Sequence, residues 1–100
     1  MTGNALYVIM RRYGPPYDAT KPLEAQQDWE AHRAFMNDLE AKGISRLAGP
    51  LEGGREVLLV FRAPNADAVE QYLERDPWTR SGILTTISIS KWDLRVGEVA

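Results

Sequence analysis

The sequence predicts an α+β fold in which four strands form an antiparallel sheet and two helices pack on one of its faces. Two observations indicate this class. Segments with strand character and segments with helical character follow one another in the order βαββαβ, and a Gly-Gly turn joins the two middle strands. The chain has 100 residues, 44% of them apolar, which is enough for one packed core and too few for a second. We therefore expect a single domain over residues 1–100, with its core at about 5–95 and a tail at 96–100.

The first half of the chain is expected to hold one strand, one long loop and one helix. Residues 5–11 (ALYVIMR) are apolar at successive positions, as in a strand that is covered on both faces. Residues 12–23 contain one Gly and three Pro and show no period, which predicts a long loop, and long loops in small domains often serve as lids or binding segments. Residues 24–42 have helical periodicity, with acidic residues near the start and Lys42 at the end, as the helix dipole favours.

The remaining strands have clear sequence signals. Residues 44–51 and 56–62 are predicted strands, and residues 52–55 (EGGR) supply the hairpin turn between them. Residues 84–92 (LTTISISKW) alternate as a final strand would. The alternation predicts two faces, one with Ile87 and Ile89 and the other with Thr86, Ser88, Ser90 and Trp92.

The second helix is expected over residues 65–75, with Asn65 as its N-cap. Pro77 disfavours helical backbone in the residue before it, so the helix is expected to stop there. Asp76 is then a negative charge at the negative end of a helix dipole, which is an unfavourable position for a carboxylate.

The order of elements predicts a ferredoxin-like sandwich, and this architecture leaves one sheet face uncovered. Two helices can cover only one face, yet the strands at 5–11 and 56–62 are apolar on both. A second copy related by a two-fold axis is the simplest cover for the other face. We therefore expect a homodimer in which two sheets pack face to face.

Composition excludes several classes of function. A formal net charge of −2 without a Lys/Arg cluster argues against a nucleic-acid partner. The chain has no cysteine and a single histidine, so a disulfide framework is impossible and a zinc site is disfavoured, and we expect no metal and no cofactor. The apolar run at 6–10 is too short for a signal segment or a membrane span, so we expect a cytoplasmic protein with no membrane partner.

Two polar residues interrupt the apolar helical stripes. His32 completes the 29, 32, 36, 39 spacing of the first helix, and Asp76 continues the stripe formed by Val69, Tyr72 and Leu73 in the second. If both helices pack on one sheet face, the two side chains can meet, and a carboxylate beside a histidine produces a competent general base. The alternative is a satisfied core histidine and an Asp-Pro helix terminator whose side chain caps the following turn, and spacing alone favours this second interpretation.

Other candidate binding residues carry weaker signals. Arg11 and Arg12 precede the loop and would suit an anionic substrate, although a solvated strand end explains them equally well. Tyr13, Tyr17 and Trp78 would form an aromatic pocket wall, or merely cover the end of a small core. Ser88, with Thr86 and Ser90, would present hydroxyl groups to a ligand, or belong to the polar face of an edge strand. Gly53-Gly54 lies in a hairpin, so it is not a phosphate-binding loop.

Several segments, in this order and spacing, resemble the YCII-related family over roughly residues 6–95: Trp29-Glu30-Ala31-His32, Phe35-Met36-Asn37-Asp38-Leu39, Gly43, Ala48-Gly49-Pro50-Leu51, Asp76-Pro77-Trp78, Gly82-Ile83-Leu84 and Trp92. The resemblance implies a dimeric α+β barrel, similar in architecture to muconolactone isomerases and small antibiotic-biosynthesis monooxygenases. It also implies a paired His and Asp as the catalytic dyad, at His32 and Asp76, and so favours the catalytic interpretation. The segment 12–23 is longer than in the shorter members of the family.

The resulting hypothesis is a cofactor-independent lyase or isomerase that acts on a small cyclic or aromatic compound. His32 would abstract a proton, Asp76 would orient it, and Arg11 with the loop at 13–17 would help to hold the substrate. Two alternatives remain open: a non-catalytic domain that binds a small ligand or another protein, and a cofactor-free monooxygenase.

Overall fold

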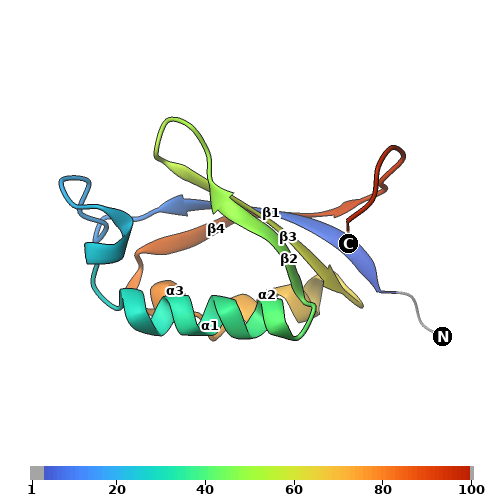
Figure 1. Cartoon of the computed structure of the whole chain (residues 1–100), viewed down its shortest axis with the longest axis horizontal. Coiled ribbons are helices and arrows are strands. Elements are labelled where there is room, and N and C mark those ends of the chain that lie inside the picture. Colours follow the sequence, from blue (N-terminus) through green and yellow to red (C-terminus); the bar gives the residue numbers. More distant parts are fainter. Residues whose placement is uncertain (1–3, 100) are drawn as a thin grey trace.

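A four-stranded antiparallel sheet forms one layer of the molecule, and the helices lie together on one face of it (Figure 1). The computed structural model describes residues 4–99. Its elements in chain order are β1 (Ala5–Tyr13), a 3-10 turn η1 (Leu23–Ala25), α1 (Trp29–Ala41), β2 (Ser45–Pro50), β3 (Glu56–Ala63), α2 (Ala66–Glu74), α3 (Pro77–Ser81) and β4 (Leu84–Trp92). The strand order β2-β3-β1-β4, with every neighbouring pair antiparallel, confirms the predicted ferredoxin-like sandwich.

The core lies between the sheet and the helices. Alternate residues of the two central strands, β1 and β3, point toward the helices. Among them, Ile9 and Leu59 are cross-strand partners, and both are almost completely buried. From the helices, Leu39, Val69 and Leu73 complete this layer. Each such side chain contributes about 1.5–3 kcal/mol through the removal of apolar surface from water. None of the helices within residues 4–99 is both long enough and apolar enough to cross a membrane.

The first helix begins later than the sequence pattern predicts. Helical backbone starts at Trp29 rather than Glu24, because Asp28 adopts a left-handed conformation with φ 62°. The segment before it is held by the buried Gln26, whose side-chain amide donates to the carbonyls of Asp18 and Lys21 and accepts from the Asp18 N–H. The loop between β1 and α1 is therefore ordered by its own polar contacts, and the prediction of one continuous helix over 24–42 was wrong.

Asp76 lies between two helices, α2 and α3. Asn65 caps α2 as predicted, since its side chain accepts from the Ala68 N–H at 2.8 Å. A further short helix, α3, begins directly after Asp76 with Pro77 at its first position, and the Asp76 carboxylate accepts from the Trp78 N–H at 3.0 Å. Asp76 thus caps the start of α3, where a negative charge is favourable. Asp76 follows the C-cap of α2, Arg75, as predicted, and its side chain caps the following turn, as the alternative interpretation expects. Its charge is therefore not the misfit that the end of α2 alone would make it.

The final strand has the predicted bounds, but its two faces differ from the prediction. The register of β4 against β1 shifts between Met10 and Arg11, which pair with Ser88 and Thr86 and leave Ile87 as the extra residue of a bulge. Ser88 therefore shares the uncovered sheet face with Met10, whereas Thr86 shares the helix-covered face with Arg11. The prediction of one face for both hydroxyl residues was wrong because simple alternation does not survive a bulge.

Candidate active site

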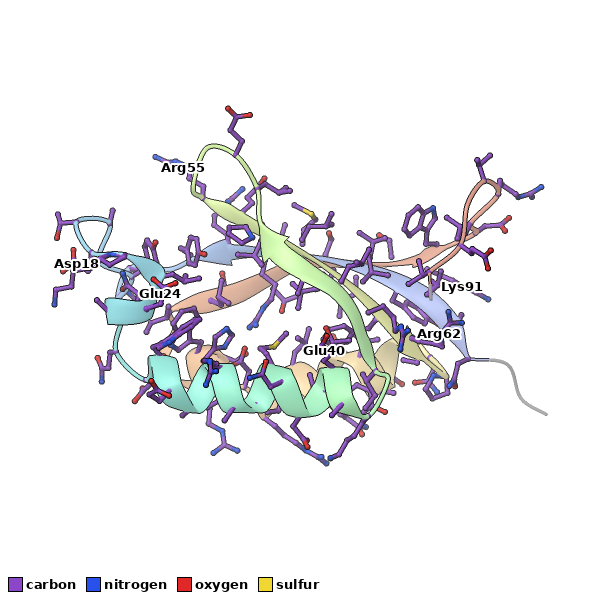
Figure 2. All side chains as sticks on the ribbon, viewed as in Figure 1. Asp18, Glu24, Glu40, Arg55, Arg62 and Lys91 are labelled. Carbon is purple, nitrogen blue, oxygen red and sulfur yellow. The ribbon has the colours of Figure 1, made fainter. Side chains whose placement is uncertain are left out.

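A cavity of about 190 Å³ lies between α1 and the sheet, at the end of the molecule where the long loop joins β1 to α1. Its walls are mostly apolar and come from η1, the helices α1 and α3 and all four strands: Arg11, Tyr13, Leu23, Trp29, His32, Met36, Ala48, Gly49, Pro50, Val57, Leu59, Trp78 and Leu84. Figure 2 shows Asp18 and Glu24 on the loop between β1 and α1, and Arg55 on the β2–β3 hairpin. The charged residues labelled at this end of the molecule therefore lie at its periphery. A ligand in the cavity would meet few charged groups.

His32 and Asp76 are in direct contact. Nδ1 of His32 lies 2.8 Å from Oδ1 of Asp76, and the histidine side chain is 12% exposed while the carboxylate is completely buried. A carboxylate can only accept a hydrogen bond, so Nδ1 carries the proton in this pair. The other ring nitrogen, Nε2, is then the basic atom of the neutral imidazole, and His32 lines the cavity.

The Asp76 carboxylate is held from three sides. Oδ1 accepts from His32 and from the Trp78 N–H, and Oδ2 accepts from the Arg11 guanidinium at 2.8 Å. Burial acts to raise the pKa of Asp76, but the hydrogen bonds and charges of His32, Trp78 and Arg11 together outweigh it and hold this pKa below its usual value. Asp76 is consequently an anion at neutral pH despite its burial.

Arg11 is completely buried rather than solvated at a strand end. Its terminal nitrogens donate to Asp76, to Oγ1 of Thr79 and to the carbonyl of Leu84, and its Nε has no partner within residues 4–99. Burial lowers the pKa of Arg11, and the bond and charge of Asp76 counteract this, so the guanidinium stays protonated. Arg12, by contrast, is exposed and pairs with Glu56 at 3.3 Å.

Trp78 supports the histidine ring. The indole and imidazole are stacked with centroids 3.9 Å apart and planes within 5°. Trp78 is 1% exposed, and its Nε1–H donates to the carbonyl of Gln27 at 2.7 Å, which fixes the indole between the loop and the core. An aromatic face favours a cation, so the stack stabilises the imidazolium that forms when His32 takes a proton. Trp78 belongs both to the core and to the cavity wall.

The two tyrosines have different positions. Tyr13 lines the cavity and stacks on Tyr17 with ring centroids 3.9 Å apart, whereas Tyr17 itself is not part of the lining. Burial, with a further contribution from Tyr17, raises the pKa of Tyr13, so this residue presents a neutral phenol at neutral pH.

The structure does not bring Ser88 to this cavity, since it lies on β4 at the edge of the sheet and shares the uncovered face with Met10. Conversely, several residues that form the site were not selected as site residues from the sequence. Trp29 and Met36 were assigned to the core stripe of the first helix, and both line the cavity. Thr79 carried no sequence signal, because its hydroxyl acquires a role only when α3 meets β1. Within residues 4–99 no three or more His, Asp or Glu side chains gather in a way that would hold a metal ion.

Comparison with known proteins supports the same fold. A search of curated protein sequences found no significant match. Among solved structures, the chain is similar to the 5-chloro-2-hydroxyhydroquinone dehydrochlorinase TftG from Burkholderia phenoliruptrix AC1100, in complex with 2,5-dihydroxybenzoquinone. The TM-score is 0.66 at 23% sequence identity, over 88% of this chain and 93% of the other. The family model of the YCII-related domain matches residues 5–93, and the chain therefore belongs to the YCII-related family.

Proposed function

We propose that this protein is a cofactor-independent lyase or isomerase that uses His32 as a general base on a small cyclic or aromatic compound. The observation that carries the proposal is the 2.8 Å contact between His32 and a buried, ionised Asp76 at the wall of an apolar cavity. A histidine in this arrangement is oriented, has a defined tautomer and gains a counter-charge as it is protonated.

The proposed chemistry begins with removal of an acidic C–H or O–H proton by Nε2 of His32. The electron pair of the broken bond enters the ring. In an elimination it expels a leaving group, which departs with the electrons of its own bond, and His32 releases its proton to solvent; in an isomerisation another ring carbon takes up the proton from His32. Asp76 and the Trp78 ring stabilise the imidazolium in the meantime. The apolar walls exclude water and so strengthen these electrostatic interactions.

The dimensions of the cavity support a single-ring substrate. An apolar protein cavity of about 150 Å³ accommodates benzene. The cavity here is about 190 Å³, so one six-membered ring with a few substituents is the largest compact ligand that matches it. Trp29 and Tyr13 supply aromatic walls for such a ring, and the phenol of Tyr13 offers it a hydrogen bond.

The similarity to a dehydrochlorinase supports elimination as the reaction type. We propose chlorinated hydroxyhydroquinones and hydroquinones as the first compounds to test, with chloride release as the measure of elimination. Exchange of ring hydrogens in D2O, followed by proton NMR, would detect proton abstraction without elimination. Both assays report on the step assigned to His32.

The decisive variant is His32→Ala, with Asn37→Ala on the exposed side of the same helix as its matched control. Loss of a general base is expected to lower turnover by roughly 10²–10⁴-fold, with the control unchanged. Turnover in His32→Ala equal to that of the native protein would remove the proposed base. Binding of these compounds by the native protein without chloride release or exchange would favour a ligand-binding domain instead.

We also propose that the active form is a homodimer, assembled through the sheet face that the helices leave uncovered. This open face carries Leu6, Val8, Met10, Leu47, Leu58, Val60 and Trp92, which are brought together by cross-strand pairs such as Val8 with Val60 and Leu6 with Trp92. Leu6 and Val60 are already buried in the single chain, whereas Leu47 is 59% and Trp92 41% exposed, so the surface left for a partner lies around these exposed residues. Contiguous apolar surface of this kind is typical of an interface.

Light scattering tests the dimer. The native chain is expected to have twice its monomer mass at micromolar concentration, and Leu47→Glu is expected to give a monomer because it places a charge in the apolar contact. Val96→Glu, at an 88% exposed position after β4, is the matched control and should remain dimeric. A native protein that is monomeric under these conditions would contradict the sheet-to-sheet interface.

A further inference from the structure

Arg11 is a charged residue at a completely buried position, and an apolar side chain would fill that space in the core without a charge. A buried guanidinium costs free energy unless it is paired and hydrogen-bonded, and apolar residues of similar volume are often as stable. Here the side chain bridges three parts of the fold, because it leaves β1 and reaches Asp76, Thr79 on α3 and the carbonyl of Leu84 on β4. Thr79 is itself anchored, since its hydroxyl donates to the Leu73 carbonyl at 2.7 Å.

The contacts of Asp76 divide between its two oxygens. Oδ2 is bound to Arg11 and Oδ1 faces His32, so the guanidinium holds the carboxylate from the side opposite the imidazole. Rotation of the carboxylate would break the contact with Arg11 or misalign the contact with His32. The contact between Arg11 and Oδ2 therefore helps to set which carboxylate oxygen faces the histidine, and at what angle.

We propose that Arg11 is a positioning residue, which fixes the orientation and charge of Asp76 so that His32 is held with its proton on Nδ1 and its basic Nε2 toward the cavity. This inference rests on the proposed function, because it concerns the same pair. This role differs from the expected one as a receptor for an anionic substrate, because both terminal nitrogens already donate to protein acceptors and Nε alone has no partner within residues 4–99.

Charge balance gives Arg11 a second consequence. The titratable groups that face His32 are Asp76 before α3 and, from β1, Arg11 and Tyr13, while the lining residues from η1, β2, β3 and β4 are uncharged. Asp28, one turn earlier on the helix side, is exposed. With neutral His32 the charges of Arg11 and Asp76 cancel, so the cavity gains a net positive charge only when the imidazole takes a proton. That charge then matches the anion left on the substrate, and a ring that forms a monoanion is favoured over a carboxylate or a phosphate.

The single histidine of the chain makes the test direct. In protein labelled with ¹⁵N at histidine, long-range proton–nitrogen NMR at neutral pH distinguishes a protonated ring nitrogen from a bare one. At a pH where the imidazole is neutral, we expect the native protein to show protonated Nδ1 and bare Nε2. Asp76→Ala serves as the reference for a lost carboxylate, because it leaves Nδ1 without its acceptor, and a free imidazole side chain prefers its proton on Nε2.

Arg11→Met is expected to lower the fraction of Nδ1–H although Asp76 and His32 are both still present, because a carboxylate without its Arg11 partner can turn away from the ring or take up a proton. Arg11→Lys should lower it too, because one ammonium group cannot reach Asp76, Thr79 and the Leu84 carbonyl together. Arg12→Met, at the neighbouring exposed position of the same strand, is the matched control and should give the native spectrum.

The outcomes separate the two proposals. A native tautomer in folded Arg11→Met, beside an altered one in Asp76→Ala, would overturn the role of Arg11 and leave the proposed function standing. A native tautomer in Asp76→Ala would overturn the pair itself and the proposed function with it. If Arg11→Met does not fold, Arg11→Lys decides in the same way, and if neither folds, Thr79→Val decides, since it removes one anchor of the guanidinium without removing a charge.

Discussion

Asp76→Asn is expected to destabilise the protein far more than an exposed carboxylate would. Asparagine is as good an N-cap as aspartate, so the bond to the Trp78 N–H and the start of α3 are retained. What is lost is the negative charge between Arg11 and His32, and Arg11 is then a fully buried cation without a counter-charge. Removal of one partner from a buried ion pair costs about 3–5 kcal/mol.

That cost is a large part of the stability of a domain of this size, which is about 5–15 kcal/mol in total. Since 1 kcal/mol corresponds to about 4–8 °C for 60–100 residues, the melting temperature should fall by about 12 °C or more. Urea unfolding followed by tryptophan fluorescence gives the free energy, and thermal unfolding followed by circular dichroism gives the temperature. Asp93→Asn is the matched control, because Asp93 pairs with Arg95 in a highly exposed position and its loss should change little.

A loss below about 1 kcal/mol in Asp76→Asn would refute the reasoning, since this is the range of a surface ion pair. It would mean that water reaches Arg11 or that the guanidinium finds other acceptors. Asp76→Ala separates the cap from the charge, because it removes both and should cost about 1 kcal/mol more than Asp76→Asn.

Two further predictions concern pH and the loop. The pKa of Asp76 is lowered in the folded protein, so its contribution to stability is complete above the unfolded pKa of about 3.9 and disappears as pH falls through the lowered folded pKa. The difference in stability between the native protein and Asp76→Asn, measured by urea unfolding, should therefore be constant near neutral pH and shrink in strong acid. A difference that stays constant down to the acid limit would contradict this. Gly14→Ala should cost about 1–3 kcal/mol in the same assay, because the new Cβ would lie 2.1 Å from the Gly82 carbonyl oxygen and the backbone must move. In the control Gly49→Ala the new Cβ meets no atom within 4 Å, so this change should be tolerated, and equal effects of the two changes would be inconsistent with the close approach at Gly14.

Much of the architecture follows from local patterns in the sequence. The final strand over residues 84–92 has the predicted bounds, and Asn65 caps α2 as predicted, because hydrophobic periodicity and capping chemistry act over a few residues. The apolar stripe of the first helix placed His32 toward the core by the same logic. The start of that helix was not predictable from periodicity, since the side chain of Gln26 and the left-handed Asp28 set it.

The candidate site depends on contacts that no local pattern encodes. The sequence alone determined the order of the elements, the face of α1 that carries His32 and the presence of an acid before Pro77. Only the tertiary structure decided that Arg11 is buried against this acid and that Trp78 stacks on the imidazole. Arg11 lies 65 positions from Asp76 and His32 lies 44 positions from it, so their meeting is set by how the sheet and helices pack and not by spacing along the chain.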